Sequence, residues 1–269
     1  MTQTPHTAPT PALLEFAEAT VVYGTTRALD EISFRIDVGE NVAIIGPNGS
    51  GKSTLIKAIT RECYPLATDS TPPIRILGEH TWNIFSLRSM LGIVSGDLQQ
   101  ACTREITGRE AVLSGFFGSI GLYPYHEVTD EMERRAEETL RFLDMAEIAD
   151  RYLTEMSTGQ ARRALIGRAL VHDPKALMLD EPANGLDPRA SHKFSGVLRK
   201  VAQSGNSIIM VTHHLQDIIP EISRVIMIDH GKVFLDGPKH EVLTEANLSR
   251  LFAMNVEIVQ RNGYYLLWS

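Results

Sequence analysis

The sequence predicts an α/β protein with a mostly parallel central sheet, an amino-terminal antiparallel β layer and an inserted helical subdomain. Short, evenly apolar runs at residues 176–179, 207–212 and 224–229 are typical of buried parallel strands. A glycine-rich loop at residues 46–54 joins an apolar strand to a helix-like run, and residues 96–155 show a helical pattern. The chain of 269 residues is long enough for one domain with a subdomain.

The order of the segments gives the expected domain organisation. Residues 1–12 are rich in Thr and Pro and are expected to be a disordered tail. Segments around 13–22 and 31–37 form the antiparallel layer, while strands near 74–77 and 91–95 are expected in the mostly parallel sheet. The expected units are a core over 13–95 and 156–254, a helical subdomain over 96–155, and a β-hairpin over 255–269 around Asn262-Gly263.

The loop at residues 46–54, here called the phosphate loop, has the pattern Gly-x4-Gly-Lys-Ser in the strand–loop–helix context that this pattern requires. Its glycines let backbone N–H groups point at phosphate oxygens, and the helix that starts at Lys52 adds its dipole. Lys52 is expected to reach the β- and γ-phosphates, Ser53 to hold Mg²⁺ and Thr54 to contact the α-phosphate. A chance match in a glycine turn is the alternative. The pattern therefore predicts a P-loop NTPase core, with nucleotide contacts from Gly46, Pro47, Asn48, Gly49, Ser50, Gly51, Lys52, Ser53 and Thr54.

Two acids follow the apolar run 176–179. Asp180 and Glu181 stand at the carboxyl end of this strand, where ligands bind in open α/β sheets. Adjacent strand residues point to opposite sides, so the two acids are free to have different roles. A solvated pair before Pro182 is the alternative. His213 directly follows the next strand, 207–212, at the same expected edge.

Residues 157–160, here called the signature segment, precede an amphipathic helix. Ser157 is suited to cap this helix, and a capped helix start with free N–H groups is an anion site. An ordinary helix cap is the alternative. Asp187 and Pro188 similarly form an N-cap and N1 pair for a helix that runs to about Gln203.

The phosphate loop, the signature segment Ser-Thr-Gly-Gln and the acidic strand occur in the order found in ABC-type ATPases, and the chain resembles this family over nearly all residues after 12. The resemblance implies that Asp180 binds Mg²⁺, that Glu181 is the general base and that His213 contacts the γ-phosphate. The commonest family form has glycine where Thr158 stands. The resemblance also implies that four residues contact the nucleotide bound to the opposite subunit: Ser157, Gly159, Gln160 and Asp187.

Two further residues are carried over from the family. Tyr23 matches the aromatic residue that stacks on adenine; a tyrosine packed on the sheet is the alternative. The family places a glutamine, with catalytic and metal-binding roles, directly after the strand that corresponds to residues 91–95. Gly96 stands there, so either Gln99 fills this role from a longer loop or the loop has diverged.

Each motif occurs once, so the resemblance implies a head-to-tail homodimer with two shared sites for ATP and Mg²⁺. The expected function is the energy-coupling ATPase of a membrane transporter, an importer of a metal oxyanion or metal chelate. The stretch 113–123 and the closing hairpin resemble ATPases of the molybdenum, iron-chelate and cobalamin groups. Residues 96–123 are expected to dock a transmembrane permease, with packing inside the subdomain as the alternative. A soluble ABC-type ATPase in regulation or repair is the second hypothesis, and a small-molecule kinase would leave the signature segment and His213 unexplained.

Net charge, the length of the apolar runs and the number of cysteines limit the partners and the cellular location that we expect for the protein. The net charge of −7 argues against nucleic acid as the main partner. No run approaches the length of a membrane-spanning helix and no signal peptide is evident. With only Cys63 and Cys102, a reducing compartment is expected. We therefore expect a cytoplasmic protein, peripheral on the inner face of the cell membrane.

Overall fold

A computed structural model describes residues 12–67, 72–95 and 105–268. The central sheet has six strands in the order β5-β6-β7-β3-β8-β9, and only β9 runs antiparallel to its neighbour. Short apolar runs form the strands other than β9 because both faces of the sheet are covered there, whereas β9 is a more polar edge strand. Their bounds are β3 Val42–Ile45, β5 Leu91–Val94, β6 Ala176–Asp180, β7 Ser207–Thr212, β8 Arg224–Asp229 and β9 Lys232–Pro238.

Alternate residues of each central strand face different cores. Ala43 and Ile45 belong to the core shared with α6 (Thr158–Leu170) and α7 (Pro188–Gln203). Val42 and Ile44 belong to the second core, which the antiparallel layer and α1 (Lys52–Ile59) cover. Successive side chains of a strand point to opposite faces of the sheet, which explains this division.

The antiparallel layer consists of β1 (Ala12–Tyr23), β2 (Thr26–Asp37) and β4 (Ile74–Ile76) in the order β2-β1-β4. The expectation that residues 74–77 join the parallel sheet is wrong, because β4 pairs with β1 in register Leu14↔Ile76. The Ile-Arg-Ile alternation buries only one face, as an antiparallel edge strand does, whereas the central strands are apolar throughout.

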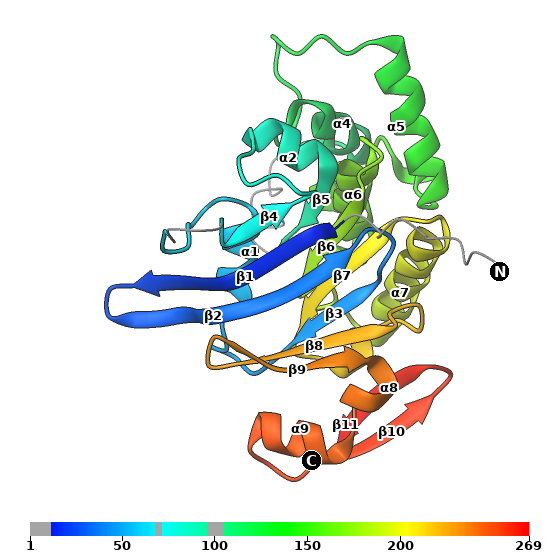
Figure 1. The fold of residues 1–269 in the computed structure, drawn as a ribbon. Coiled ribbons are helices and arrows are strands. Elements are labelled where there is room, and N and C mark those ends of the chain that lie inside the picture. Colours follow the sequence, from blue (N-terminus) through cyan, green and yellow to red (C-terminus); the bar gives the residue numbers. More distant parts are fainter. Residues whose placement is uncertain (1–11, 68–71, 96–104, 269) are drawn as a thin grey trace, which may run out of the picture.

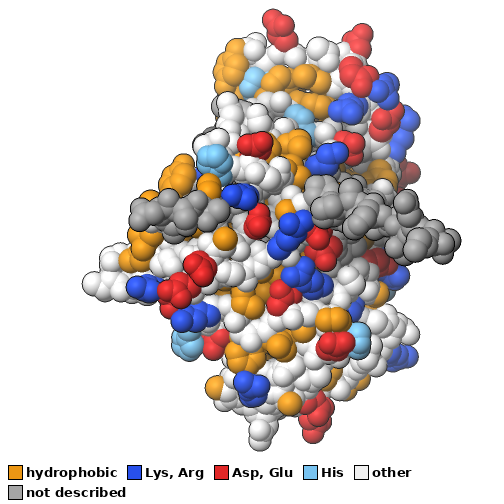
Figure 2. Space-filling view, viewed as in Figure 1, with side chains coloured by type: hydrophobic (Ala, Val, Ile, Leu, Met, Phe, Trp, Pro, Cys, Tyr) orange, Lys and Arg blue, Asp and Glu red, His pale blue; other side chains and the backbone are white. Residues whose placement is uncertain are grey.

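The helical part lies at one end of the sheet and the closing hairpin at the other (Figure 1). Thr107 and Thr129 cap α4 (Gly108–Leu113) and α5 (Asp130–Phe142). Glycines and aromatics after α4 form a 3₁₀ turn over Ser114–Phe117 rather than a longer helix. Charges of both signs are interspersed along α5 (Figure 2).

The hairpin of β10 (Glu257–Arg261) and β11 (Tyr264–Trp268) forms around Asn262-Gly263 as predicted. Three helices were not predicted: α2 (Ile84–Met90), α8 (Lys239–Val242) and α9 (Glu245–Phe252). None of the helices within the described ranges is long and apolar enough to cross a membrane.

Candidate nucleotide site

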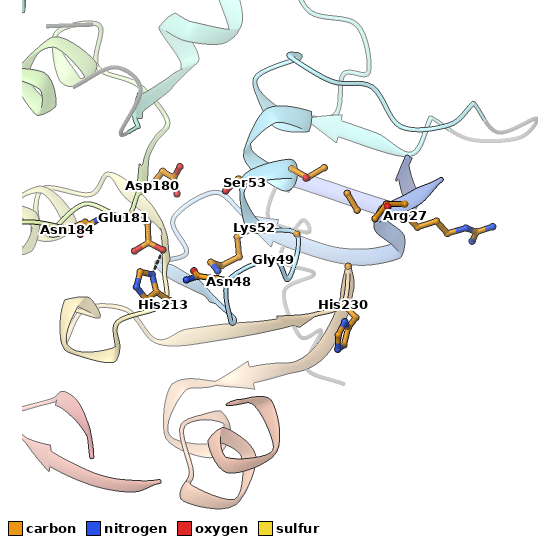
Figure 3. A pocket seen from close by; sticks show the side chains of 15 residues that line it. Arg27, Asn48, Gly49, Lys52, Ser53, Asp180, Glu181, Asn184, His213 and His230 are labelled. Carbon is orange, nitrogen blue, oxygen red and sulfur yellow. Dashed lines mark hydrogen bonds and ion pairs between the residues drawn. The ribbon is translucent and has the colours of Figure 1, made fainter. Parts of the chain in front are cut away.

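Parallel pairing brings the ends of three strands to one edge of the sheet. Ile45 of β3 is in register with Thr212 of β7, and Asp180 of β6 is in register with Val211. The phosphate loop, the acidic pair and His213 therefore meet, as predicted. They line a cavity of about 510 Å³ (Figure 3). Its lining residues are Thr26, Arg27, Ala28, Asn48, Gly49, Gly51, Lys52, Ser53, Thr54, Asp180, Glu181, Asn184, His213, His230 and Gly231.

The phosphate loop needs its glycines for two physical reasons. Gly51 has φ +109°, in the region that side chains disfavour, and a Cβ there would lie 2.6 Å from the Ala28 carbonyl oxygen. A Cβ at Gly46 would lie 2.2 Å from the Ile228 carbonyl oxygen. The backbone thus approaches its neighbours more closely than any other residue allows, which keeps the loop folded over the start of α1.

Lys52 is buried at the first position of α1, with only 7% of its surface exposed. Its Nζ donates to the carbonyl oxygens of Gly46 at 2.8 Å and Pro47 at 2.9 Å. Burial lowers the pKa of this ammonium group, while the charges of Glu181 and Asp180 counteract the shift. A buried cation inside a loop of backbone N–H groups is the donor set that a polyphosphate chain requires.

Glu181 adopts a left-handed backbone with φ +46°, and its N–H donates to the Val211 carbonyl oxygen at 2.8 Å. Such a conformation costs a non-glycine residue on the order of 1–3 kcal/mol and persists where neighbours enforce it. Oε1 lies 2.6 Å from His213 Nδ1, and Oε2 accepts from Thr212 Oγ1 at 3.3 Å. Figure 3 shows Glu181, His213 and Lys52 at one end of the cavity, with Arg27 and His230 at the other.

Beneath this carboxylate lies a buried pair that sequence reasoning missed. Thr212 is fully buried, and its Oγ1 accepts from the His214 N–H at 3.0 Å and lies 3.1 Å from Asp217 Oδ2. Burial raises the pKa of Asp217, while the hydrogen bond with Thr212 opposes that rise. An acid four residues after His213 is the only sequence signal of this pair, and it does not by itself show burial.

The signature segment starts α6 with a complete capping box. Ser157 Oγ accepts from the Gln160 N–H at 3.4 Å, and Gln160 Oε1 accepts from the Ser157 N–H at 2.9 Å. Asp187 caps α7 through Ala190 N at 2.8 Å, with Pro188 at N1, as predicted. A Cβ at Gly159 would lie 3.3 Å from Ala190 Cβ, so the two helix starts are close together.

The predicted residues therefore divide into two groups. Of the residues that the structure describes, Ser157, Gly159, Gln160 and Asp187 do not line the Lys52 cavity. The two helix starts form a second location in the same chain.

Two expectations from the resemblance stay predictions. Tyr23 does not line the cavity; its ring is half exposed, and a hydrogen bond with the Cys63 thiol raises the pKa of its hydroxyl. The segment Thr26–Ala28 lines the cavity instead. Gln99 lies outside the described residues. Sequence reasoning also missed Arg27, near the start of β2, and His230, in the turn between β8 and β9, because neither belongs to a local motif.

Comparison with known proteins also indicates an ABC transporter ATP-binding protein. A family model described as ABC transporter matches residues 29–184, more than half of the chain. The uncharacterized ABC transporter ATP-binding protein YlmA of Bacillus subtilis is 34% identical, with 86% of this chain and 87% of the relative covered. The Nod factor export ATP-binding protein I of Sinorhizobium fredii is 33% identical over 86% of this chain, which spans only 64% of that protein.

Solved structures agree with the sequence comparison. The chain superposes on cbiO1 from Clostridium perfringens, part of the ABC transporter complex cbiONQ, with a TM-score of 0.74, 30% identity and coverage of 89% of this chain and 94% of that chain. A dimeric structure of the bacterial ABC transporter cassette MJ0796 matches with a TM-score of 0.66 and 25% identity, covering 84% of this chain and 98% of that one.

Proposed function

The chain belongs to the ATP-binding subunits of ABC transporters and is an ATPase, and from that premise we propose that two copies form a head-to-tail homodimer that powers a transmembrane permease. The observation that carries this proposal is the separation of the two binding groups within one chain. The cavity contains Lys52 and Glu181, whereas Ser157 and Gly159 lie outside it. A second copy is needed to bring a signature segment to each cavity, and the dimeric MJ0796 cassette supports such an arrangement.

Within each cavity the side chains have distinct proposed roles. Lys52 and the N–H groups of the phosphate loop bind the phosphates of ATP. Ser53 and Asp180 both line the cavity and offer the hydroxyl and carboxylate oxygens that Mg²⁺ prefers. When bound, Mg²⁺ would neutralise charge on the phosphates. Gln99 stays a prediction for the same ion.

Hydrolysis requires a base beside the phosphates, and Glu181 is our candidate. Its carboxylate lines the cavity and is the group able to polarise a water and accept its proton. The 2.6 Å contact to His213 Nδ1 fixes one oxygen, and Thr212 holds the other. With its hydrogen on Nδ1, His213 donates to Glu181, and its contact with the γ-phosphate stays a prediction. This pair is therefore oriented before substrate binds.

The substitution Glu181→Gln tests the assignment. Gln preserves the shape but cannot accept a proton, so we expect ATP binding to persist while turnover falls by about 1,000-fold or more. Light scattering with ATP should then show a stable dimer, and without nucleotide a monomer. The exposed substitution Glu133→Gln in α5 is the matched control. Near-normal hydrolysis by Glu181→Gln would remove Glu181 from the role of base.

We further propose that the permease docks on the helical part. A groove of about 440 Å³ lies between α2 and the 3₁₀ turn, lined by Ser86, Ser89, Gly115, Phe116, Phe117, Gly118 and His172. Phe116 packs edge-on against His172, and Phe117 stacks on His126, with 4.1 Å between ring centroids. Hydrophobic side chains gather on this end of the molecule (Figure 2). Apolar, pre-organised grooves of this kind suit a short amphipathic helix.

Phe117→Ala should reduce the amount of permease that copurifies with the chain from membranes, because it removes an aromatic wall of the groove. Phe142→Ala, at a partly exposed phenylalanine of α5, is the control. Equal recovery of permease with both variants would place the docking surface elsewhere.

We place the cargo among metal oxyanions and metal chelates that are taken into the cell, and the chain on the cytoplasmic side of the membrane. The support is the resemblance of the segment 113–123 and of the closing hairpin to the ATPases of such importers. Purification of Glu181→Gln with ATP from detergent-solubilised native membranes tests this proposal. A multi-span partner whose vesicles accumulate a metal anion or chelate supports it. Outward transport contradicts import, and recovery of only a soluble ATP-bound dimer favours a regulatory or repair ATPase.

A further inference from the structure

Arg162 occupies an unusual place in the second turn of α6. Only 6% of its surface is exposed, and its guanidinium donates from Nη1 to the Pro182 carbonyl oxygen and from Nη2 to that of Asn184. Nε is buried with no hydrogen-bond partner in the described part of the chain. Burying a guanidinium against neutral carbonyls costs free energy, which its hydrogen bonds offset only in part.

The two carbonyls belong to the turn that directly follows Glu181. Because Glu181 has φ +46°, its conformation depends on anchors on both sides. Its own N–H is tied to Val211 on one side. On the other side, Arg162 is the side chain that ties down Pro182. A change at Arg162 therefore acts on the residue that carries the proposed base.

Asp217 links the same arginine to the catalytic carboxylate from below. Burial lowers the pKa of Arg162, and the negative charge of Asp217 opposes this shift, which places the two groups within electrostatic reach. Asp217 is 4% exposed and contacts Thr212 Oγ1, which in turn contacts Glu181. Two routes thus lead from α6 to Glu181: one through the backbone turn and one through side chains.

We propose that Arg162 is a positioning residue that fixes Glu181 through the Pro182–Asn184 turn and makes its placement depend on α6. Arg162 lies five residues after Ser157 on one rigid helix, so any displacement of the signature segment moves the guanidinium with it. In the proposed dimer the signature segment contacts the nucleotide of the partner site. Arg162 then couples occupancy of one site to the base of the other, and this coupling rests on the proposed head-to-tail dimer.

The adjacent Arg163 provides a matched control. It has the same chemistry and stands on the same helix, but its Nη1 donates at 3.1 Å to the carbonyl oxygens of Leu143 and Asp144 in the helical part. It does not touch the turn after Glu181 in the described structure. Arg162→Met and Arg163→Met thus remove equal side chains that have different partners on α6.

Arg162→Met should lower kcat by about 10- to 100-fold while KM for ATP changes by less than about threefold, because the base is misplaced but the phosphate loop is intact. The Hill coefficient for ATP should fall towards one. Arg162→Lys, which restores one donor and the charge, should recover part of kcat and is the variant to use if Met at this position prevents folding. Arg163→Met should leave both kcat and the Hill coefficient near wild type.

Three results overturn the proposal: wild-type kcat for both Arg162 variants, the same kcat loss in Arg163→Met, or a loss that appears entirely in KM. An Arg162→Met, Glu181→Gln double variant that still dimerises with ATP separates the two proposals. If Glu181→Gln alone fails to dimerise, the proposed dimer and the coupling through it fail. The kcat of the Arg162 variants then still decides the positioning role.

Discussion

Thr212→Val is the substitution whose effect follows most directly from the structure. Thr212 is fully buried, and Val has nearly its shape but lacks the hydroxyl. The change leaves the His214 N–H, 3.0 Å away, and the Asp217 carboxyl, 3.1 Å away, without this partner. Each unsatisfied buried polar group costs about 1–3 kcal/mol, so for two groups we expect a loss of roughly 2–6 kcal/mol of unfolding free energy.

The same hydroxyl shares its one hydrogen between Asp217 Oδ2 and Glu181 Oε2, which lies at the longer distance of 3.3 Å, while His213 Nδ1 lies 2.6 Å from Oε1. Losing the weaker of two contacts should reduce kcat by only about 3- to 10-fold. Stability is measured by chemical denaturation at pH 7, and kcat on the same preparations.

Two controls separate the hydroxyl from the methyl group. Thr212→Ser keeps the hydroxyl and should recover most of kcat. Thr139→Val removes a hydroxyl that only donates to the Arg135 carbonyl oxygen within α5, and it should cost less than about 1 kcal/mol. If Thr212→Val is as stable as Thr139→Val and turns over like wild type, the reasoning about this buried pair is wrong.

Three further predictions follow from single contacts. Lys52→Ala removes the buried cation of the phosphate loop, and calorimetry should show ATP affinity lowered by about 10- to 100-fold; unchanged affinity would contradict its phosphate role. Gly196→Ala fills open space in the exposed part of α7 and should raise the free energy of unfolding by about 0.5–1 kcal/mol, whereas Gly46→Ala meets the Ile228 carbonyl oxygen at 2.2 Å and should prevent native folding. Because burial raises the pKa of Asp217 above its usual 3.8, native stability from this group is full below that pH and is lost as pH rises through the folded pKa. Asp217→Asn should therefore gain stability relative to wild type between pH 4 and pH 7, and a constant difference over this range would refute the shift.

Local signals predicted much of the fold. The caps at Ser157 and Asp187 were readable because a capping residue acts within its own helical turn. The central strands were readable from length and apolar content. The error at β4 arose because strand pairing is non-local, and a three-residue run cannot specify whether its neighbour is parallel or antiparallel.

The same limit applies to the site. The phosphate loop, Asp180, Glu181 and His213 share strand ends, a relation that topology rules provide. The contacts of Arg162 with Pro182 and of Thr212 with Glu181 join residues 20 and 31 positions apart, and no periodicity or motif encodes them. Tyr23 was assigned by resemblance alone; its hydroxyl bonds the Cys63 thiol and the cavity lining does not include it, so its contact with adenine stays a prediction.

The contacts of α6 give a physical reason for placing the signature helix between the permease groove and the base. Arg168, near its end, donates to the Ser119 carbonyl oxygen at 2.8 Å, just beyond the groove that Phe116 and Phe117 line. Arg163 ties its middle to the helical part, and Arg162 ties its opposite face to the turn after Glu181. A helix held at both ends by charged side chains moves as one body, because its backbone hydrogen bonds resist bending. If the permease docks at the groove as proposed, these contacts of α6 connect the docking surface to the turn that follows Glu181.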